Sequence, residues 1–309
     1  MSVFLSTLSQ TTFLFLLIAI GFLLGKLGVL GSDGAKTLAK LENTVFVPCL
    51  ILGTFIEHFT VERLSFFASL LGVSTLLTVG VVAIAIPMGR LLSKDVYERN
   101  IFTYGLVFSN FGFMGNAVVT ALFPELFLHY LIFTLPLWFL IYLWGVPSLL
   151  IADAGKQQTF GDRFRALINP MFIALLVGML LGLCRIPIPT PVKSVIDVSG
   201  SCMSPIAMLL TGITVSKIDF KKTFTCVRIY LVSAVRLLVM PLLFLLVGLV
   251  IPFNSVVRVC AVTSLAMPLG LNTIVIPSAY GKDTTVAAGM AIISHLLSLL
   301  TIPLVYALL

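Results

Sequence analysis

Charged residues are scarce in this sequence of 309 residues. Asp, Glu, Lys and Arg make up 10% of the chain, whereas they make up about 25% of a soluble globular protein. Hydrophobic residues account for 59%, and the mean hydropathy is +1.16. So few polar residues cannot cover a water-facing surface, which excludes a cytosolic enzyme, a disordered tail and a secreted disulfide scaffold. The composition predicts a polytopic membrane protein.

Motifs for catalysis and for cofactor or metal binding are also absent from the sequence. There is no GxxxxGK[ST] loop for a nucleotide, no HExxH helix for zinc and no GxSxG elbow for a nucleophile. The five cysteines lack CxxC spacing, and buried cysteine usually behaves as a small hydrophobic side chain. Although the formal charge is +7, the basic residues form no cluster of the kind that binds nucleic acid. We therefore expect no enzyme activity, no cofactor, no metal site and no nucleic-acid partner.

Long apolar runs divide the chain into segments that can each cross a membrane. A spanning helix needs roughly 20 apolar residues, so a chain of this length holds about ten. The runs are continuous rather than alternating between apolar and polar residues, which favours an all-α fold over a membrane β-barrel. We expect the spans at residues 10–26, 38–56, 65–88, 99–122, 127–151, 168–185, 191–214, 226–251, 256–280 and 285–308.

The distribution of lysine and arginine predicts how these spans are oriented, because cytoplasmic loops retain basic residues. With the loops assigned alternately to the two sides, fourteen Lys and Arg fall on one side and four on the other. We therefore expect a multi-pass protein of the cell membrane with both termini outside and the central loop in the cytoplasm. No Lys or Arg precedes Lys26, so the first run is expected to be a retained helix rather than a cleaved signal.

Weak internal repetition indicates two halves of five spans each. Pro48 recurs as Pro205 at an offset of 157, and Pro147 recurs as Pro303 at an offset of 156. An odd number of spans per half inverts the second half, and inverted repeats are typical of secondary transporters. The alternative is that proline is simply frequent in membrane helices. We expect a first five-helix repeat at residues 1–151, a cytoplasmic linker at 152–167 and a second, inverted repeat at 168–309.

The fourth and ninth spans carry residues that interrupt a helix. Gly112 and Gly115 lie close together in the fourth, and Pro268 in the ninth lacks an amide donor and clashes with the preceding turn. Lipid cannot satisfy the backbone groups that a break releases, so a break is tolerated only inside protein or beside a wet cavity. Asn116 and Asn272 follow the two breaks, and we expect them to cap the second half-helices.

Two half-helix N-termini near the midplane would present positive dipole ends and free amides, which favour an anion such as a carboxylate. The alternative is a pair of kinks at which the glycines only permit close helix packing. Arg236 lies inside the eighth span, where it either neutralises an anionic substrate or pairs with Glu42 or Asp197, unless its long side chain only extends to the interface. His295 is expected to be a core histidine. The residues that we assign to the substrate site are Ser109, Asn110, Gly112, Gly115, Asn116, Pro268, Gly270, Asn272 and Arg236.

Three segments carry a resemblance to a known family: Ser109 to Gly115, Asn169-Pro170, and Met267-Pro268 through Ala279-Tyr280-Gly281. In this order, and over nearly the whole chain, they resemble the auxin efflux carrier family, whose bacterial members are often described as malate or malonate permeases. The resemblance implies ten transmembrane helices in two inverted five-helix repeats, with broken helices 4 and 9 crossing at the substrate site. It also implies intertwined scaffold and transport domains that move in an elevator-like cycle. One difference is that Ala117 stands where the family usually has proline.

Together with this resemblance, the sequence predicts a secondary transporter, or permease, that moves small organic anions across the membrane by alternating access. Its partners are then the organic anion and the lipid bilayer, with a proton or another cation as an optional coupling ion and a homodimer as an optional assembly. Two alternatives use the same crossing. One is a membrane receptor or sensor that binds the ligand without moving it, and the other is an anion channel.

Overall fold

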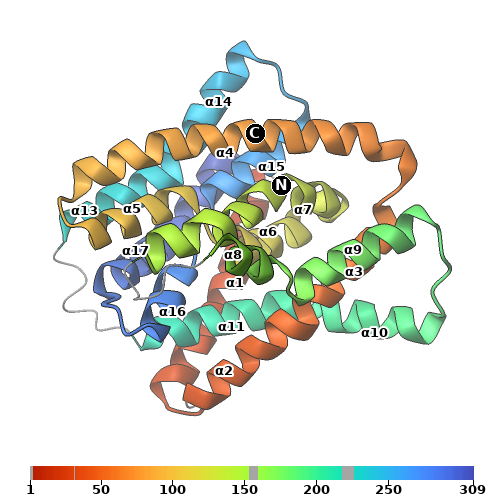
Figure 1. Ribbon diagram of the computed structural model, residues 1–309, viewed down its shortest axis with the longest axis horizontal. Helices are drawn as coiled ribbons and strands as arrows, with labels where there is room; N and C mark the ends of the chain where they lie inside the picture. Colours follow the sequence, from red (N-terminus) through yellow and green to blue (C-terminus); the bar gives the residue numbers. More distant parts are fainter. Residues whose placement is uncertain (1–2, 31, 153–158, 218–225) are drawn as a thin grey trace.

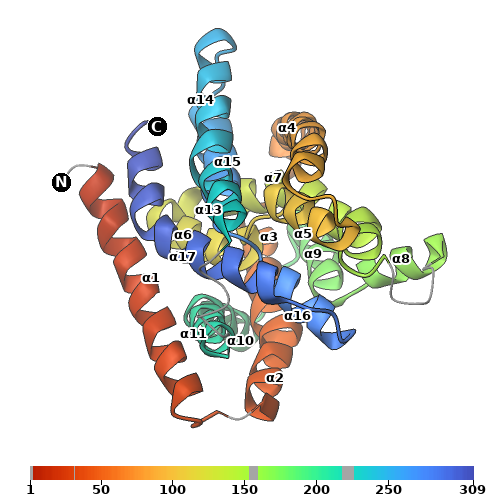
Figure 2. The ribbon, with the colours of Figure 1, turned by 90° about the vertical axis from the view of Figure 1, so that its left-hand side faces the viewer.

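The computed structural model is built from helices throughout the described residues, which are 3–30, 32–152, 159–217 and 226–309 (Figures 1 and 2). The first half of the chain forms α1 (Val3–Lys26), α2 (Ser32–Leu41), η1 (Glu42–Phe46), α3 (Val47–His58), η2 (Val61–Arg63), α4 (Leu64–Leu92), α5 (Val96–Val107), η3 (Phe111–Gly115), α6 (Asn116–Leu122), η4 (Pro124–Leu126), α7 (Phe127–Leu140) and η5 (Ile141–Leu150). The second half forms α8 (Phe160–Leu167), α9 (Pro170–Leu183), α10 (Thr190–Ser201), α11 (Met203–Ser216), α13 (Val227–Ala234), η6 (Val235–Val239), α14 (Met240–Val250), α15 (Ser255–Ala266), α16 (Asn272–Ala279) and α17 (Thr285–Tyr306).

Among the described residues, seven helical segments are long and apolar enough to cross a membrane, and an eighth results if the bent pair α8–α9 counts as one span. Several of these segments join consecutive helices, such as α2, η1 and α3 in Gly34–His58. Helices Phe111–Leu122 and Ser255–Ala266 are apolar but shorter. The all-helical, multi-pass class is thereby confirmed, while the arrangement of ten helices as two inverted repeats stays a prediction.

The first helix is longer than the sequence pattern suggested. It begins at Val3 rather than at residue 10. The Thr11 hydroxyl donates to the Thr7 carbonyl in this extra part, at 2.7 Å, so a polar side chain of the helix is satisfied within the helix. Apolar periodicity alone therefore placed the start of the helix too late.

Side-chain caps fix the starts of the helices that lead into the site. The Asp95 carboxylate accepts from the Glu98 amide at 2.8 Å at the start of α5, and the Asn254 side chain accepts from the Val257 amide at 2.8 Å at the start of α15. Such caps satisfy amides that have no partner within the helix. The two helices that are later interrupted thus both begin at a defined residue.

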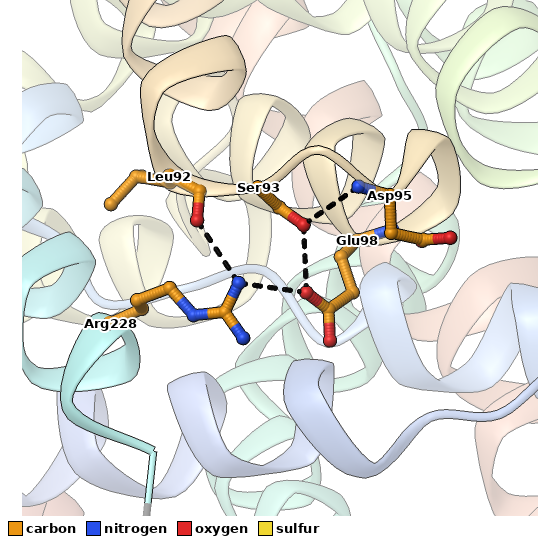
Figure 3. A network of polar contacts seen from close by, with 5 residues as sticks. All are labelled: Leu92, Ser93, Asp95, Glu98 and Arg228. Carbon is orange, nitrogen blue, oxygen red and sulfur yellow. Dashed lines mark hydrogen bonds and ion pairs between the residues drawn. The ribbon is translucent and has the colours of Figure 1, made fainter.

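A polar network ties the beginning of α5 to its neighbours (Figure 3). Arg228 Nη1, from α13, lies 3.0 Å from both the Leu92 carbonyl at the end of α4 and Glu98 Oε2. The Ser93 hydroxyl donates to Glu98 Oε2 at 2.9 Å and accepts from the Asp95 amide at 3.1 Å. This network holds the α4–α5 junction against α13.

Two helix pairs, α1 with α11 and α3 with α9, approach each other closely at glycines. A Cβ atom at Gly21 of α1 would overlap the backbone of Leu209 in α11. A Cβ atom at Gly178 of α9 would lie 2.8 Å from the Phe55 Cβ and 3.2 Å from the Leu52 carbonyl oxygen in α3. Only glycine permits this separation, so these residues set how the helices around the site pack.

Candidate functional site

Two helices of the structure are interrupted. The first ends at Val107 with α5, and the chain resumes a helical path at Phe111, in the π turn η3 that continues into α6. The second ends at Ala266 with α15, and α16 begins at Asn272. The breaks fall at the glycine-rich and proline-containing segments that the sequence singled out.

The two interruptions run antiparallel and are hydrogen-bonded to each other. Ser109 and Leu269 form an isolated antiparallel bridge, and the Asn110 amide donates to the Pro268 carbonyl at 2.7 Å. The Ser109 hydroxyl also donates to the Ser264 carbonyl at 2.7 Å. Each break therefore satisfies backbone groups of the other, as a position inside a membrane requires.

Other amides at this crossing have no protein acceptor within the described chain. In the first broken helix, Gly115 is the first residue whose amide bonds within the turn, to the Asn110 carbonyl at 3.0 Å. The amides of Gly112 and Phe113, which precede it, therefore remain available. In the second broken helix the Asn272 amide is likewise without an acceptor. These are the positive, N-terminal ends of the second half-helices.

The prediction that Asn116 and Asn272 cap these half-helices is wrong. In the first broken helix, the second half already begins at Phe111 as a π turn, so Asn116 lies one turn inside it. The preceding Gly115 is helical, with φ −63° and ψ −44°. The residue before Asn272 is also helical, and no side-chain cap is formed there. Neither asparagine side chain therefore caps the amides at the start of its half-helix.

A cavity of about 1140 Å³ lies against the crossing. Its wall is built from both interrupted segments together with parts of α2, α3, α7, η5, α9 and α11. Six of the nine residues assigned to the site line it: Ser109, Asn110, Gly112, Asn116, Gly270 and Asn272. The crossing and the cavity are thus one site.

The described lining of this cavity is mostly apolar, and its charged side chains are lysines. Lys36 of α2 and Lys217 after α11 are the charged side chains on it, and no Asp or Glu of the described residues lines it. One wall is aromatic: Trp138 stacks on Phe172 with ring centroids 5.9 Å apart and contacts Tyr142 edge-on at 5.2 Å. Such a lining suits a ligand with an apolar body and a negatively charged group.

Gly115 and Pro268 support the crossing from behind rather than line the cavity. Tyr130 of α7 donates its hydroxyl to the Phe111 carbonyl at 3.1 Å, and a Cβ atom at Gly115 would collide with that hydroxyl. A Cβ atom at Gly112, by contrast, would meet nothing within 4 Å. The close-packing role therefore applies to Gly115, whereas Gly112 leaves room beside the cavity.

Arg236 is buried, with 2% of its surface exposed, and lies behind the crossing rather than on the cavity. Its Nη1 donates to the Leu106 carbonyl and its Nη2 to the Ser264 carbonyl, both at 2.8 Å. Neither Glu42 nor Asp197, the carboxylates considered as its partners, is bonded to it. Asp197 pairs with Lys193 at 2.8 Å, and both carboxyl oxygens of the fully buried Glu42 lack a hydrogen-bond partner among the described residues.

Two residues of α17 hold the crossing: His295, which is buried as the sequence predicts for a core histidine, and Ser294, which the sequence did not single out. His295 of α17 bonds the Ala291 carbonyl through Nδ1 at 2.7 Å, so Nδ1 is the donor and Nε2 faces the Asn110 side-chain nitrogen at 3.4 Å. Ser294 accepts from the Leu269 amide at 3.0 Å. The sequence does not reveal these two contacts, because each residue is distant in sequence from the segment that it contacts.

Comparison with known sequences identifies the family of the chain. Residues 7–306 match the family described as membrane transport protein. The chain belongs to this family. The match confirms the resemblance to auxin efflux carriers. The chain is also 25% identical, over 98% of both sequences, to a protein called an uncharacterized transporter from Methanothermobacter thermautotrophicus.

Membership of the membrane transport protein family agrees with the apolar helices, and the chain is a multi-pass membrane protein. Family and relative both point to transport rather than catalysis. Within the described ranges, no three His, Cys, Asp or Glu side chains are grouped as a metal site.

Proposed function

We propose that this chain is a secondary transporter for small organic anions and that the cavity at the crossing binds them. The observation that carries the proposal is that Gly112 and Asn272, one from each interrupted helix, line the same cavity and have backbone amides without an acceptor among the described residues. Amides at a helix N-terminus are a ready site for a carboxylate, because the helix dipole adds to their hydrogen bonds.

The charges on the cavity wall support an anion rather than a cation. Lys36 and Lys217 are exposed to the cavity. A cation would enter without any carboxylate among the described lining residues to balance its charge. The aromatic wall of Trp138 and Phe172 offers contact area for the carbon skeleton of the ligand.

Contacts between helices support the inverted repeat that such transporters use. Gly21 of α1 approaches Leu209 of α11, and Gly178 of α9 approaches Leu52 of α3. Gly178 follows Gly21 by 157 residues, and Leu209 follows Leu52 by the same 157 residues. The two contacts are therefore the same contact made reciprocally between the halves of the chain, at the offset of the proline repeats. Two intertwined five-helix repeats explain this pattern.

The direction in which the cavity opens follows from the distribution of basic residues. Lys36 and Lys217 belong to the side that carries fourteen Lys and Arg, which the positive-inside rule assigns to the cytoplasm. A cavity that reaches both lysines is then open to the cytoplasm, as in the inward-facing state of an alternating-access cycle. An elevator movement of the helices that carry the crossing, relative to α1, α3, α9 and α11, would expose the same site to the other side.

The membrane potential sets the direction of uncoupled movement. An inside-negative potential of 100 mV drives a singly charged anion outward with about 2.3 kcal/mol. Export therefore needs no coupling ion, whereas uptake needs a proton or another cation.

Ligand binding and flux test the proposal in sequence. Purified protein is heated with acetate, malonate, malate or citrate; a ligand present at 100 times its Kd stabilises a protein by about 2.7 kcal/mol, which raises the melting temperature. Labelled carboxylate is then followed in proteoliposomes, where counterflow against unlabelled carboxylate is expected. Asn272→Pro removes the backbone amide that is proposed to bind the anion, at the first position of α16, where proline is tolerated, so it is expected to weaken binding and flux. Asn43→Ala is expected to leave both unchanged, because Asn43 lies on the cavity wall outside the crossing and bonds the Ala39 carbonyl one turn earlier.

Three outcomes contradict the proposal. Stabilisation without flux indicates a receptor or sensor. Open-pore currents without counterflow indicate a channel. Absence of both stabilisation and flux for every carboxylate refutes the anion site itself.

A further inference from the structure

Arg236 is a buried cation whose partners are carbonyl oxygens. Its two terminal nitrogens each donate a hydrogen bond of 2.8 Å, one to Leu106 and the other to Ser264. Among the described residues, no Asp or Glu forms an ion pair with it. A buried charge without a compensating partner is costly, so these carbonyls must supply the compensation.

The two carbonyls belong to the last turns of the two first half-helices. Leu106 lies one residue before the end of α5, and Ser264 lies two residues before the end of α15. The last carbonyls of a helix have no partner within it and form the negative end of the helix dipole, equivalent to about −0.5 of an elementary charge. Two such ends add up to about −1, which a single guanidinium neutralises.

The same breaks leave two positive ends on the cavity. Each second half-helix begins there with unbonded amides, at Gly112 in the first and at Asn272 in the second, and contributes about +0.5 of an elementary charge. Without Arg236 the partial charges of the four helix ends at the two breaks would sum to about zero. With Arg236 in place they sum to about +1, and the uncompensated part faces the cavity.

We propose that Arg236 is a positioning residue that makes the cavity selective for anions without touching the ligand, by neutralising the negative ends of α5 and α15. The inference rests on the proposed function, because it assigns a residue to the charge preference of that site. Arg236 also holds the crossing together mechanically, since the Ser264 carbonyl that it binds accepts from Ser109 as well. A test must therefore separate its charge from its hydrogen bonds.

The charge of the ligand provides that separation. Lactate and malate are both 2-hydroxy acids, with charges of −1 and −2. Loss of a unit charge a short distance from the ligand costs on the order of tenfold in affinity per unit of ligand charge. Arg236→Gln is therefore expected to weaken the binding of lactate about tenfold and the binding of malate about a hundredfold. Arg236→Lys retains the charge and is expected to preserve the ratio of the malate affinity to the lactate affinity. Equal losses for the two acids in Arg236→Gln would show a mechanical role only and overturn the proposal.

Arg228 offers a matched control. It is also an arginine that joins helices through a backbone carbonyl, but it lies in the network at the start of α5 and pairs with Glu98 at 3.0 Å (Figure 3). Arg228→Gln is expected to leave the malate-to-lactate ratio as it is in the unmodified protein. A ratio that falls equally in Arg228→Gln and Arg236→Gln also overturns the proposal.

A second measurement reads the electrostatic potential without any substrate. The thiol of an Asn272→Cys variant is modified by an anionic and by a cationic methanethiosulfonate, and the exposed Cys184 of the same molecule serves as the internal reference. The anionic reagent is expected to be favoured at position 272 relative to Cys184, and Arg236→Gln added to this variant reduces that preference about tenfold. A cationic preference with Arg236 in place refutes the proposal even if Arg236→Gln fails to fold. If no carboxylate binds but the anionic preference holds, the proposed substrate has failed and the role of Arg236 stands.

Discussion

Gly115→Ala is expected to disrupt the crossing from behind. A Cβ atom at Gly115 would collide with the Tyr130 hydroxyl and lie 3.1 Å from Tyr130 Cζ and 3.4 Å from Met267 Cγ. The tyrosine must then move and lose its 3.1 Å bond to the Phe111 carbonyl. The Phe111 carbonyl keeps the Asn116 amide as a donor, but leaving the buried Tyr130 hydroxyl without an acceptor costs about 1–3 kcal/mol, and overpacking costs about 1–3 kcal/mol more. The higher helix propensity of alanine returns up to about 1 kcal/mol, so the net loss is about 1–6 kcal/mol.

Thermal unfolding in detergent measures this loss, and a second glycine in the same segment is the control. Gly112→Ala is expected to melt at or slightly above the temperature of the unmodified protein, because its Cβ meets nothing within 4 Å. Gly115→Ala is expected to melt several degrees lower. Tyr130→Phe removes the colliding hydroxyl. It is therefore expected to lower the stability of the Gly115→Ala variant by less than it lowers the stability of the unmodified protein. Equal melting temperatures for Gly115→Ala and Gly112→Ala would refute the reasoning.

Three further substitutions test the packing and the polar contacts by thermal unfolding. Gly178→Val is expected to lower the melting temperature because its side chain would overlap α3, whereas Gly72→Val, with open space around it, is not. The same melting temperature for both variants would contradict the close approach of α9 and α3. Ser109→Ala removes the donor to the Ser264 carbonyl and costs about 1 kcal/mol, so an unaltered melting temperature counts against this contact. Glu42→Met replaces a fully buried carboxyl that lacks partners in the described chain with an apolar side chain of similar size. It is expected to stabilise the protein by about 1–3 kcal/mol, and a lower melting temperature would show an unrecognised partner.

The sequence was sufficient to predict the class of fold and the positions of the two breaks, because both depend on local composition. Continuous apolar runs give spanning helices, and Pro268 disfavours a continuous helix at its position because it lacks an amide donor and clashes with the preceding turn. Six of the nine assigned residues then line one cavity. The starts of the second half-helices were not predictable in the same way. The π turn from Phe111 to Gly115 has no sequence signature, so Asn116 was misassigned as a cap.

Roles that depend on distant contacts could not be predicted from the sequence. Arg236 was recognised as unusual because a charge inside a span is costly. Its partners, however, lie 130 and 28 residues away and are backbone carbonyls, which the identity of the side chains does not reveal. Glu42 was one of the two carboxylates that the sequence offered as partners for Arg236, yet it is fully buried and its carboxyl oxygens have no hydrogen-bond partner among the described residues. Local sequence indicates the position of a residue along its helix but not the direction in which its side chain points.

The central claim is that an organic anion binds between the amides of the two interrupted helices. A structure of the protein determined with bound malate tests it most directly. The account predicts density for a carboxylate within hydrogen-bond distance of the amides of Gly112 and Asn272, with Arg236 behind the crossing and out of contact with the ligand. Malate bound elsewhere on the protein, or two helices that run without interruption through the crossing, would contradict it.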